Sequence, residues 1–398
     1  MKKILAMLLA LVMVMGLVAC GGNKPAETNA PTETNAPAES NPAESTPDES
    51  TPTVDGTEYK IAMITDYGDI TDQSFNQTTY EAVKAFGETN GVDYRYYRPT
   101  GDSTAERVGM VEAAILDGYN VIVMPGFAFG ETLVEVADAY PEIKFVALDV
   151  ADGEGGFHAT ENVFSAVYQE ELSGYMAGYA AVKLGYKHLG YLGGMAVPAV
   201  QRFGYGFLQG VDAAAAELNI SGEITVEYVY GNQFFGDADI TAVMDTWYGE
   251  KGVECVFACG GGIWSSAAEA AAKVGGKVIG VDVDQSATIN GMYGEGMTVT
   301  SAMKGLAPTV KDVLTAIVLE DNWAAYAGKI ETLGLVSADP EANYVQIPME
   351  TTQFAEGFTA DDYKALVAAM FEGTVTVSGD ISAMPTVSYT INEYPNIK

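Results

Sequence analysis

Polar and aromatic side chains of the kinds that bind small molecules gather in one loop, residues 65–76, with the sequence TDYGDITDQSFN. Asp66 opens the loop, and Ser74, Phe75 and Asn76 stand where a helix is expected to begin. Carboxylate, hydroxyl and amide groups exchange hydrogen bonds with ligand hydroxyls and N–H groups, whereas Phe75 offers a face on which a planar ring can stack. These four residues are therefore candidate ligand contacts.

The same loop has a purely structural interpretation. Ser74 could cap the helix, and Asp69 and Asp72 could do no more than complement the helix dipole. Phe75 could equally belong to the hydrophobic core. The sequence leaves both interpretations open.

Carboxylates also occur at the ends of two further expected strands, at Asp149 and at Asp282, and Lys304 follows another. Acids in such positions accept hydrogen bonds from hydroxyls or ring N–H groups, and a lysine can donate to a hydroxyl or carbonyl. We take all three as candidate ligand contacts. The alternatives are solvated loop acids in a very acidic protein and, for Lys304, a surface salt bridge.

Glycine-rich aromatic loops follow three other expected strands. They are residues 125–130 (PGFAFG), 231–237 (GNQFFGD) and 260–264 (GGGIW), and glycine permits a close approach of ligand to backbone. Phe127, Phe235, Gly261 and Trp264 are the candidate contacts here, although Phe127 or its neighbour Phe129 could be core. The glycine run is no phosphate loop, because the lysine and the serine or threonine that should follow are missing.

Metal and nucleophile chemistry find little support. The two histidines, His158 and His188, are far apart and lack metal-ligand spacing with cysteine or acid. Cys255 and Cys259 lie on one expected strand, roughly 13 Å apart at about 3.3 Å per residue, so they cannot form a disulfide with each other. We expect no cofactor and no metal.

The elements that must position these residues alternate between short apolar runs and longer amphipathic stretches, which indicates parallel sheets with crossover helices. Strands are expected at residues 60–65, 94–98, 121–124, 144–148, 188–191, 224–230, 255–258, 278–281 and 299–303. Helices are expected at residues 74–89, 103–117, 130–139, 168–184, 203–218, 237–249, 265–274 and 306–319. The fold class is α/β, with two doubly wound, Rossmann-like lobes whose facing strand ends bind the ligand.

The expected lobe boundaries follow from this alternation. Lobe I comprises residues 57–165 plus about 285–345, and lobe II comprises residues 166–284. Residues 346–398 form a C-terminal segment that crosses between the lobes. Its short runs at residues 374–377 and 386–389 are edge strands or pack against the lobes.

The N-terminus predicts export. Two lysines precede an apolar stretch that is shorter than the roughly 20 residues of a membrane-spanning helix and ends in the lipobox-like LVAC of residues 17–20. Residues 1–19 are thus a lipoprotein signal peptide, and lipidated Cys20 anchors the chain to the extracytoplasmic face of the cell membrane. The alternative is an ordinary secretory signal with a chance cysteine. Residues 20–56 have the low-complexity composition of a disordered tether.

The formal net charge of −34 excludes nucleic acid as a partner, because a phosphate backbone would be repelled.

Taken in order, several motifs resemble the basic membrane protein family, the purine-nucleoside-binding lipoproteins of bacterial ABC importers with a type I periplasmic-binding fold. The motifs are residues 66–76, 126–129, 193–195 with Arg202 and Phe203, 260–262, 280–285 and 300–304. The resemblance spans most of the chain after the tether. Trp264 and Glu131 depart from it, because members often carry a small residue and an aspartate at these positions.

The resemblance implies roles for the candidate residues. Phe75 and an aromatic of the other lobe, first of all Phe235, would sandwich the base, with Asp149 on its polar edge. Asp66, Asp282 and Lys304 would hold the ribose hydroxyls, and Ser74 and Asn76 would add hydrogen bonds. The implied partner is an ABC permease, and the protein is expected to be a monomer.

Three other functions remain to be weighed. A receptor for a sugar or other small metabolite could use the same fold. A secreted nucleosidase could use strand-end aspartates near a ribose, but the dense aspartate cluster that would bind a metal with the ribose is missing, so we do not expect an enzyme. A surface antigen or sensor could bind ligand without feeding a transporter.

Overall fold

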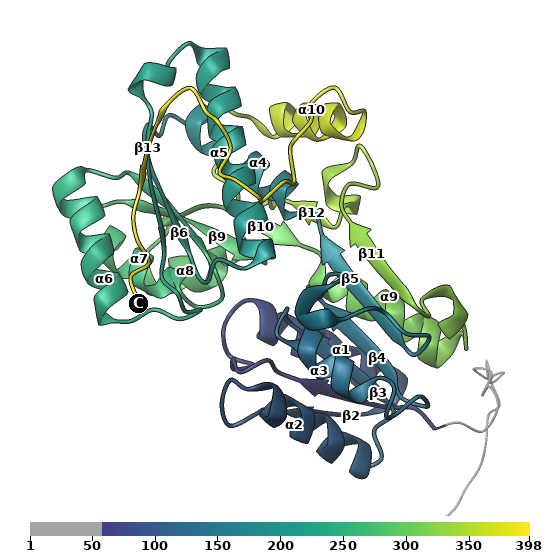
Figure 1. The fold of residues 1–398 in the computed structure, drawn as a ribbon. Coiled ribbons are helices and arrows are strands. Elements are labelled where there is room, and N and C mark those ends of the chain that lie inside the picture. Colours follow the sequence, from purple (N-terminus) through teal and green to yellow (C-terminus); the bar gives the residue numbers. More distant parts are fainter. Residues whose placement is uncertain (1–57) are drawn as a thin grey trace, which may run out of the picture. The chain divides into compact units, whose positions relative to one another are not determined.

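The computed structural model describes residues 58–398, which form two α/β lobes (Figure 1). The predicted signal peptide, lipidation site and tether lie outside the described residues. Within the described range no helix combines the length and the apolar character needed to cross a membrane.

Lobe I is built on a six-stranded parallel sheet with the order β11-β5-β4-β3-β1-β2. Its strands are β1 (Lys60–Ile64), β2 (Asp93–Tyr97), β3 (Val121–Pro125), β4 (Lys144–Leu148), β5 (Val163–Tyr168) and β11 (Lys329–Leu333). All five residues of the central strand β3 are buried, whereas edge strand β2 buries only one. Continuous apolar runs are expected for parallel strands that helices cover on both faces.

Four helices cover this sheet: α1 (Phe75–Asn90), α2 (Thr104–Leu116), α3 (Phe129–Val136) and α9 (Leu306–Leu314). Helices α1 and α9 pack on one face and share a core with β1, β3 and β5. Helices α2 and α3 pack on the other face. Helix α9 continues into the π-helical turn η4 (Thr315–Leu319).

Lobe II is built on a seven-stranded sheet with the order β12-β10-β9-β8-β6-β7-β13, in which β12 alone is antiparallel to its neighbour. Its strands are β6 (His188–Gly193), β7 (Thr225–Tyr230), β8 (Cys255–Cys259), β9 (Lys277–Asp282), β10 (Thr298–Lys304), β12 (Val345–Gln346) and β13 (Thr390–Glu393). The first five strands of each lobe have the same spatial order, 2-1-3-4-5. The two lobes therefore present equivalent strand ends.

Lobe II has helices on both faces of its sheet. Helices α4 (Glu170–Lys183), α5 (Pro198–Leu218) and α10 (Ala360–Phe371) share one core. Helices α6 (Ala238–Asp245), α7 (Trp264–Ala272) and α8 (Ser286–Tyr293) share the other, and α6 continues into the π-helical turn η3 (Thr246–Lys251).

Reciprocal glycines let α4 and α5 approach closely. A Cβ atom on Gly174 or Gly178 of α4 would lie 2.2 or 2.3 Å from a backbone oxygen of α5. A Cβ atom on Gly206 or Gly210 of α5 would lie 2.1 Å from a backbone oxygen of α4. Because no side chain fits between them, the two helices have one close register.

The chain passes between the lobes three times, after β5, after β10 and between β11 and β12. This arrangement differs from the expected boundaries. Strand β10 pairs with β9 and so extends lobe II to Lys304, beyond the expected limit at residue 284. The third passage lies between residues 333 and 345, and the segment after β12 then follows lobe II, where α10 and β13 lie.

The nine strands expected from the sequence are all present within two residues of their predicted limits. Strands β5, β11, β12 and β13 and helices α8 and α10 were not predicted. No strand forms at residues 374–377, and β13 begins just after residues 386–389; both runs pack against the core of lobe II. Helix α5 starts at Pro198, five residues earlier than predicted, because proline is favoured in a first helical turn.

Candidate binding pocket

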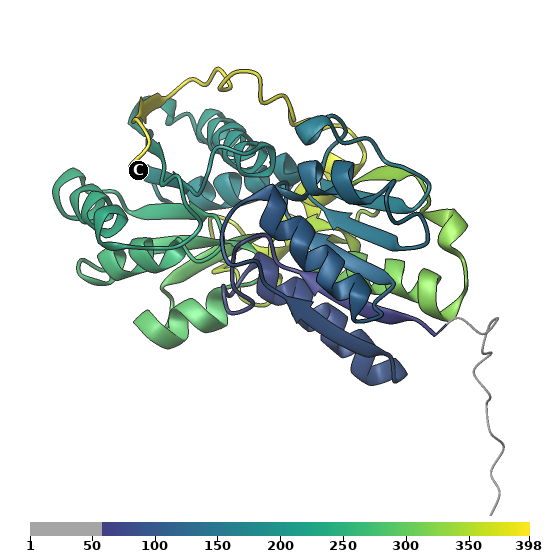
Figure 2. The same cartoon turned by 60° about the horizontal axis from the view of Figure 1, so that its bottom comes forward.

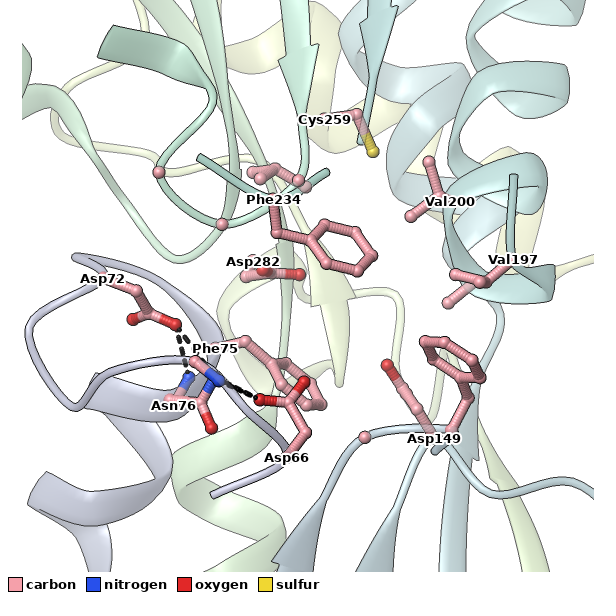
Figure 3. Close-up of a pocket in the computed structure, with 18 of the residues that line it drawn as sticks. Asp66, Asp72, Phe75, Asn76, Asp149, Val197, Val200, Phe234, Cys259 and Asp282 are labelled. Carbon is pink, nitrogen blue, oxygen red and sulfur yellow. Dashed lines mark hydrogen bonds between the residues drawn. The ribbon is translucent and has the colours of Figure 1, made fainter. Parts of the chain in front are cut away.

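A pocket of ≈630 Å³ lies at the carboxyl ends of the strands and is lined by residues of both lobes (Figure 3). Lobe I contributes the loops after β1, β3 and β4, and lobe II contributes the loops after β6, β7, β8 and β9. The volume is in the range of about 300–1,000 Å³ that is usual for small-molecule sites.

Acidic side chains of the loop after β1 hold its backbone in place through hydrogen bonds. Asp72 accepts backbone N–H bonds from Ser74 (2.9 Å), Asn76 (2.9 Å) and Gln77 (3.0 Å), and so it caps α1. The structural interpretation is thus right for Asp72 and wrong for Ser74, which makes no side-chain cap. The Ser74 hydroxyl instead donates to Asp282 of lobe II at 2.6 Å.

Asp66 and Asn76 form a buried polar pair on the lobe I wall. One oxygen of Asp66 accepts the backbone N–H groups of Tyr67 and Gly68, both at 2.7 Å, and the Asn76 amide at 3.3 Å. Burial raises the pKa of Asp66 despite these bonds. The amide oxygen of Asn76 is buried and has no hydrogen-bond partner. This oxygen is an unused acceptor beside the pocket.

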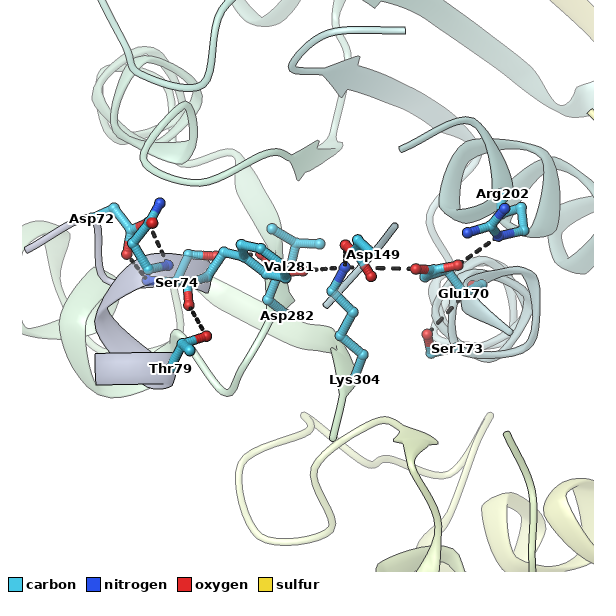
Figure 4. A network of polar contacts seen from close by, with 12 residues as sticks. Asp72, Ser74, Thr79, Asp149, Glu170, Ser173, Arg202, Val281, Asp282 and Lys304 are labelled. Atoms are coloured by element: carbon cyan, nitrogen blue, oxygen red, sulfur yellow. Dashed lines mark hydrogen bonds and ion pairs between the residues drawn. The ribbon is translucent and has the colours of Figure 1, made fainter. Parts of the chain in front are cut away.

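Lys304, at the end of β10, is the cation of a buried cluster of acids (Figure 4). Its Nζ binds the carboxylate of Asp149, lies 3.5 Å from Glu170 and lies 3.7 Å from Asp282. The Lys304 side chain is 3% exposed. The surface-salt-bridge alternative is therefore wrong, and so is the view of Asp149 and Asp282 as solvated loop acids.

Asp149 and Asp282 occupy equivalent positions in the two lobes. Asp149 follows β4 and Asp282 ends β9, the fourth strand of its lobe. Both residues have left-handed backbone conformations, with φ of 62° and 65°. A non-glycine residue rarely adopts this conformation, and such strain concentrates at binding sites. The unusual backbone turns both carboxylates towards the same lysine.

The cluster shifts the proton affinities of its members. Burial lowers the pKa of Lys304, but the neighbouring carboxylates outweigh it and raise that pKa, so the lysine stays charged. Burial, reinforced by Glu170 and Asp282, raises the pKa of Asp149 to about 6 although Lys304 opposes the shift. One oxygen of Asp149 is buried without a hydrogen-bond partner. It is a second unused acceptor.

Glu170 and Arg202 belong to this cluster but were not among the candidate residues. Arg202 Nε donates to Glu170 at 2.6 Å, and Glu170 is fully buried at the start of α4. The sequence did not predict Glu170, because it did not predict strand β5, which ends two residues before it. Arg202 was seen only as part of a motif, because α5 was predicted to begin after it.

Aromatic rings line the pocket on several sides. Phe75 packs partly against the lobe I core and also lines the pocket, with its ring centre 4.6 Å from Lys304 Nζ. The core alternative is therefore partly right, and the role of Phe75 as a ligand contact stays a prediction. Phe127 lines the pocket, whereas Phe129 is fully buried in the core.

On the lobe II side two adjacent phenylalanines, Phe234 and the predicted Phe235, line the pocket. Phe235 is 57% exposed at the rim, whereas the ring of Phe234 projects into the pocket opposite Phe75 (Figure 3). The Phe234 carbonyl accepts the Gly262 N–H at 2.8 Å, which fixes the loop. The ring of Phe234 faces Phe75, and no sequence signal separates these two adjacent phenylalanines.

The glycine-rich loop after β8 forms the remaining wall. Gly260 and Gly261 have positive φ values of 154° and 51°, and a Cβ atom on Gly260 would lie 3.0 Å from the Phe234 ring. Trp264 begins α7 and lines the pocket, but its ring packs into the lobe II core and its indole N–H has no partner.

This arrangement is suited to binding a ligand with one flat apolar part and one hydroxyl-rich part. The rings offer stacking faces, and the acid cluster with its unused oxygens accepts hydrogen bonds from hydroxyl or N–H groups. Burial makes an unpaired acid costly, so such a cluster would disfavour a ligand that leaves it unsatisfied. Both described cysteines are buried free thiols, and residues 58–398 contain no group of three His, Cys, Asp or Glu side chains placed to hold a metal.

The chain is similar to proteins of one transport family. A family model described as "ABC transporter substrate-binding protein PnrA-like" matches residues 59–338. The "ABC transporter nucleoside-binding protein BmpA" of Lactococcus lactis subsp. cremoris is 27% identical over 274 residues, covering 65% of this chain and 74% of the relative. "Basic membrane protein B" of Borreliella afzelii is 27% identical over 287 residues, covering 70% and 79%.

Solved structures agree on the fold. An ABC transporter solute-binding protein from Aeropyrum pernix K1 superposes with a TM-score of 0.61 at 23% identity, covering 80% of this chain and 87% of that one. The type I periplasmic-binding fold expected from the sequence is thus confirmed.

Proposed function

The chain belongs to the PnrA-like family of ABC transporter substrate-binding proteins, and we propose that its pocket captures a purine nucleoside for import. Since the family consists of substrate-binding components, the chain is a binding protein and no enzyme. The observation that carries the nucleoside proposal is the Lys304 cluster of strand-end acids beside the Phe75 ring, with Phe234 opposite. The name of the Lactococcus lactis relative, a nucleoside-binding protein, agrees with this proposal.

In this proposal the base stacks between Phe75 and Phe234, since stacking on aromatic rings tolerates any purine. The ribose hydroxyls meet Asp282, Lys304 and Asp66. Asp149, with its unpaired oxygen, accepts from an N–H or hydroxyl of the ligand.

The remaining candidate residues complete the proposed contacts. Asn76 accepts through its free amide oxygen, and Ser74 acts through Asp282. Phe127, Gly261, Trp264 and Phe235 line the walls and rim.

Calorimetric titration tests this assignment. The full chain, purified in detergent, is titrated with guanosine, adenosine and inosine, and separately with ribose, glucose and galactose. We expect heat with at least one nucleoside, and a loss of about 100-fold or more in affinity in Phe75→Ala and Asp282→Ala. Phe371→Ala, an exposed aromatic on α10, is the control and should bind like the parent.

A receptor for a sugar or another polyol is the second candidate, because an acid cluster around a lysine suits the hydroxyls of any such ligand. Mass spectrometry and an ultraviolet spectrum of ligand carried through purification separate the two candidates. A nucleobase absorbs in the ultraviolet and a sugar does not. Heat with a sugar and none with any nucleoside would overturn the nucleoside proposal.

We further propose that Cys20 carries the lipid anchor at the extracytoplasmic face, that the protein is a monomer and that it delivers ligand to an ABC permease. Metabolic labelling with a fatty acid should mark the parent and not Cys20→Ala. Release of Cys20→Ala into the medium is the expected consequence. Genes for a permease and an ATPase beside this one would favour transport over a sensor or antigen role.

A further inference from the structure

The C-terminal strand segment, residues 390–398, extends the lobe II sheet as far as the loop that carries Phe234. Strand β13 pairs in parallel with β7 from Thr390 to Glu393. The pairing continues beyond the strand, because the backbone N–H groups of Tyr394 and Ile397 donate to Tyr228 and Tyr230 at 2.9 Å. Tyr230 is the last residue of β7, so the segment reaches the base of the loop at residues 231–237.

Buried contacts hold this segment in place. Glu227 of β7, which is 2% exposed, accepts from the Tyr394 hydroxyl (2.5 Å) and from the Asn392 amide (3.0 Å). The ring of Tyr394 lies 6.0 Å from that of Trp247, and Ile397 packs against the same core as α7. Figures 1 and 2 show the segment, in yellow, running along lobe II to the C-terminus.

The segment ends with an ion pair between Lys398 and Asp237, the last residue of the aromatic loop at residues 231–237. Lys398 Nζ binds Asp237 at 2.9 Å and also binds Asp239. Asp237 caps α6 through the N–H groups of Asp239 and Ile240, both at 3.0 Å. The N–H bond from Ile240, with help from Lys398, lowers the pKa of Asp237 to about 2, so it is a carboxylate at neutral pH.

A continuous chain of contacts leads from Lys398 to the pocket rim. The Asp237 oxygen that binds Lys398 also accepts the side-chain amide of Gln233 at 3.0 Å. The same amide donates to the carbonyl of Phe235 at 2.9 Å. Lys398 thus braces the backbone that presents Phe234 and Phe235.

We infer that residues 390–398 are a positioning element of the ligand site and that Lys398 is its key positioning residue. It touches no ligand and acts by holding the aromatic loop in the conformation that places Phe234 opposite Phe75. A loop without this brace must be ordered when ligand binds, and that ordering lowers affinity. The segment lies beyond residues 59–338, the part that the family model matches. The inference about affinity rests on the proposed function, but the inference about the loop does not.

The test compares Lys398→Met and Lys398→Arg in the full chain with Lys364→Met as the matched control. Lys364 is an exposed lysine on α10 that forms a salt bridge with Asp361. We expect Lys398→Met to raise the Kd for the best-bound nucleoside about three- to tenfold with an unchanged melting temperature. Lys398→Arg should restore the affinity, and Lys364→Met should have no effect. The difference between Lys398→Met and the parent should shrink above about 0.5 M salt, where the ion pair is screened.

Hydrogen exchange supplies a readout that needs no ligand. In Lys398→Met, and more so after deletion of residues 394–398, amides in residues 231–241 should exchange faster while those of β8 and α5 do not change. If the parent binds no nucleoside and Lys398→Met still shows this exchange pattern, the proposed function is contradicted and the inference about the loop still holds. Unchanged Kd and unchanged exchange in Lys398→Met would overturn the inference. If the deletion fails to fold, the point variant decides alone.

Discussion

At the scale of single residues, the pocket depends on how one buried cation is shared. Among residues 58–398, Lys304 is the amino group that contacts the carboxylates of Asp149, Glu170 and Asp282, and Arg202 forms an ion pair with Glu170. Removing the cation would leave uncompensated negative charge in a site with little access to water, which is strongly unfavourable.

Lys304→Met is therefore expected to lower the free energy of unfolding by about 3–5 kcal/mol at pH 7. Denaturant titration measures this loss. Adding Asp149→Asn should recover part of it, because one unpaired charge is removed. Lys311→Met, an exposed lysine on α9, should change stability by less than about 0.5 kcal/mol. A similarly small change in the free energy of unfolding of Lys304→Met would show that Lys304 and its neighbouring carboxylates do not form a network of ion pairs.

Glu171 gives a pH-dependent prediction. It is 6% exposed in the first turn of α4, one of its oxygens has no partner, and burial raises its pKa to about 7 from the ordinary 4.5. The native state therefore holds a proton that the unfolded chain releases between pH 4.5 and 7, so this group makes the protein less stable as the pH rises through that window.

Glu171→Gln should remove this loss. The variant should match the parent below pH 4.5 and exceed it by up to about 3 kcal/mol above pH 7. Denaturant titrations between pH 4 and 8 measure the difference, and the exposed Glu250→Gln should stay within about 0.5 kcal/mol of the parent throughout. A difference that does not depend on pH would contradict the assignment.

At the scale of elements, the contact between α4 and α5 positions several residues of the proposed ligand site. Glu170 lies at the start of α4 and Arg202 in the first turns of α5, so their ion pair requires the close register that the facing glycines allow. The same register holds Phe203 beneath Lys304, with its ring centre 5.7 Å from Nζ. Helix packing thus positions residues of the proposed ligand site.

Gly178→Ala should destabilise the protein by about 1–3 kcal/mol and weaken ligand binding, because its Cβ would lie 2.3 Å from the Phe207 carbonyl. Thermal unfolding and calorimetry measure the two effects. Gly109→Ala in α2 is the matched control: its Cβ would meet nothing within 4 Å, so it should stabilise by about 0.5–1 kcal/mol. Equal behaviour of the two variants would show that α4 and α5 can separate at no cost.

At the scale of the whole molecule, charge limits the ligand class. The chain carries a net charge of −34. Six acids line the pocket against three basic residues, and the acids are Asp66, Asp69, Asp72, Asp149, Glu154 and Asp282. An anionic ligand would approach and enter a negative potential.

Nucleoside 5′-monophosphates should accordingly bind at least about 100-fold more weakly than the matching nucleoside. Calorimetry with the two ligands measures the ratio, and a 5′-O-methyl nucleoside controls for added bulk without charge. Comparable binding of the monophosphate would show that the acids near the ligand are neutralised.

Local sequence patterns determined much of this protein's fold and many of its candidate site residues. Apolar runs and amphipathic spacing predicted the nine strands and the doubly wound fold, because backbone conformation and burial depend on near neighbours. Asp66, Phe75, Asn76, Asp149, Asp282 and Lys304 were found because parallel strands all end at one edge of a sheet. A residue that directly follows a recognised strand is therefore visible as a candidate without a structure.

Only the tertiary structure decided which of these residues meet. Lys304 and Asp149 are 155 positions apart in the chain, and no local pattern encodes their contact. Phe234 and Phe235 are adjacent and identical in type, so the loop backbone alone determines which ring enters the pocket. Glu170 follows a strand that the sequence did not reveal, and β13 is paired with β7 by contacts 165 residues distant in sequence. Short-range preferences specify the elements, whereas long-range packing and charge pairing specify the site.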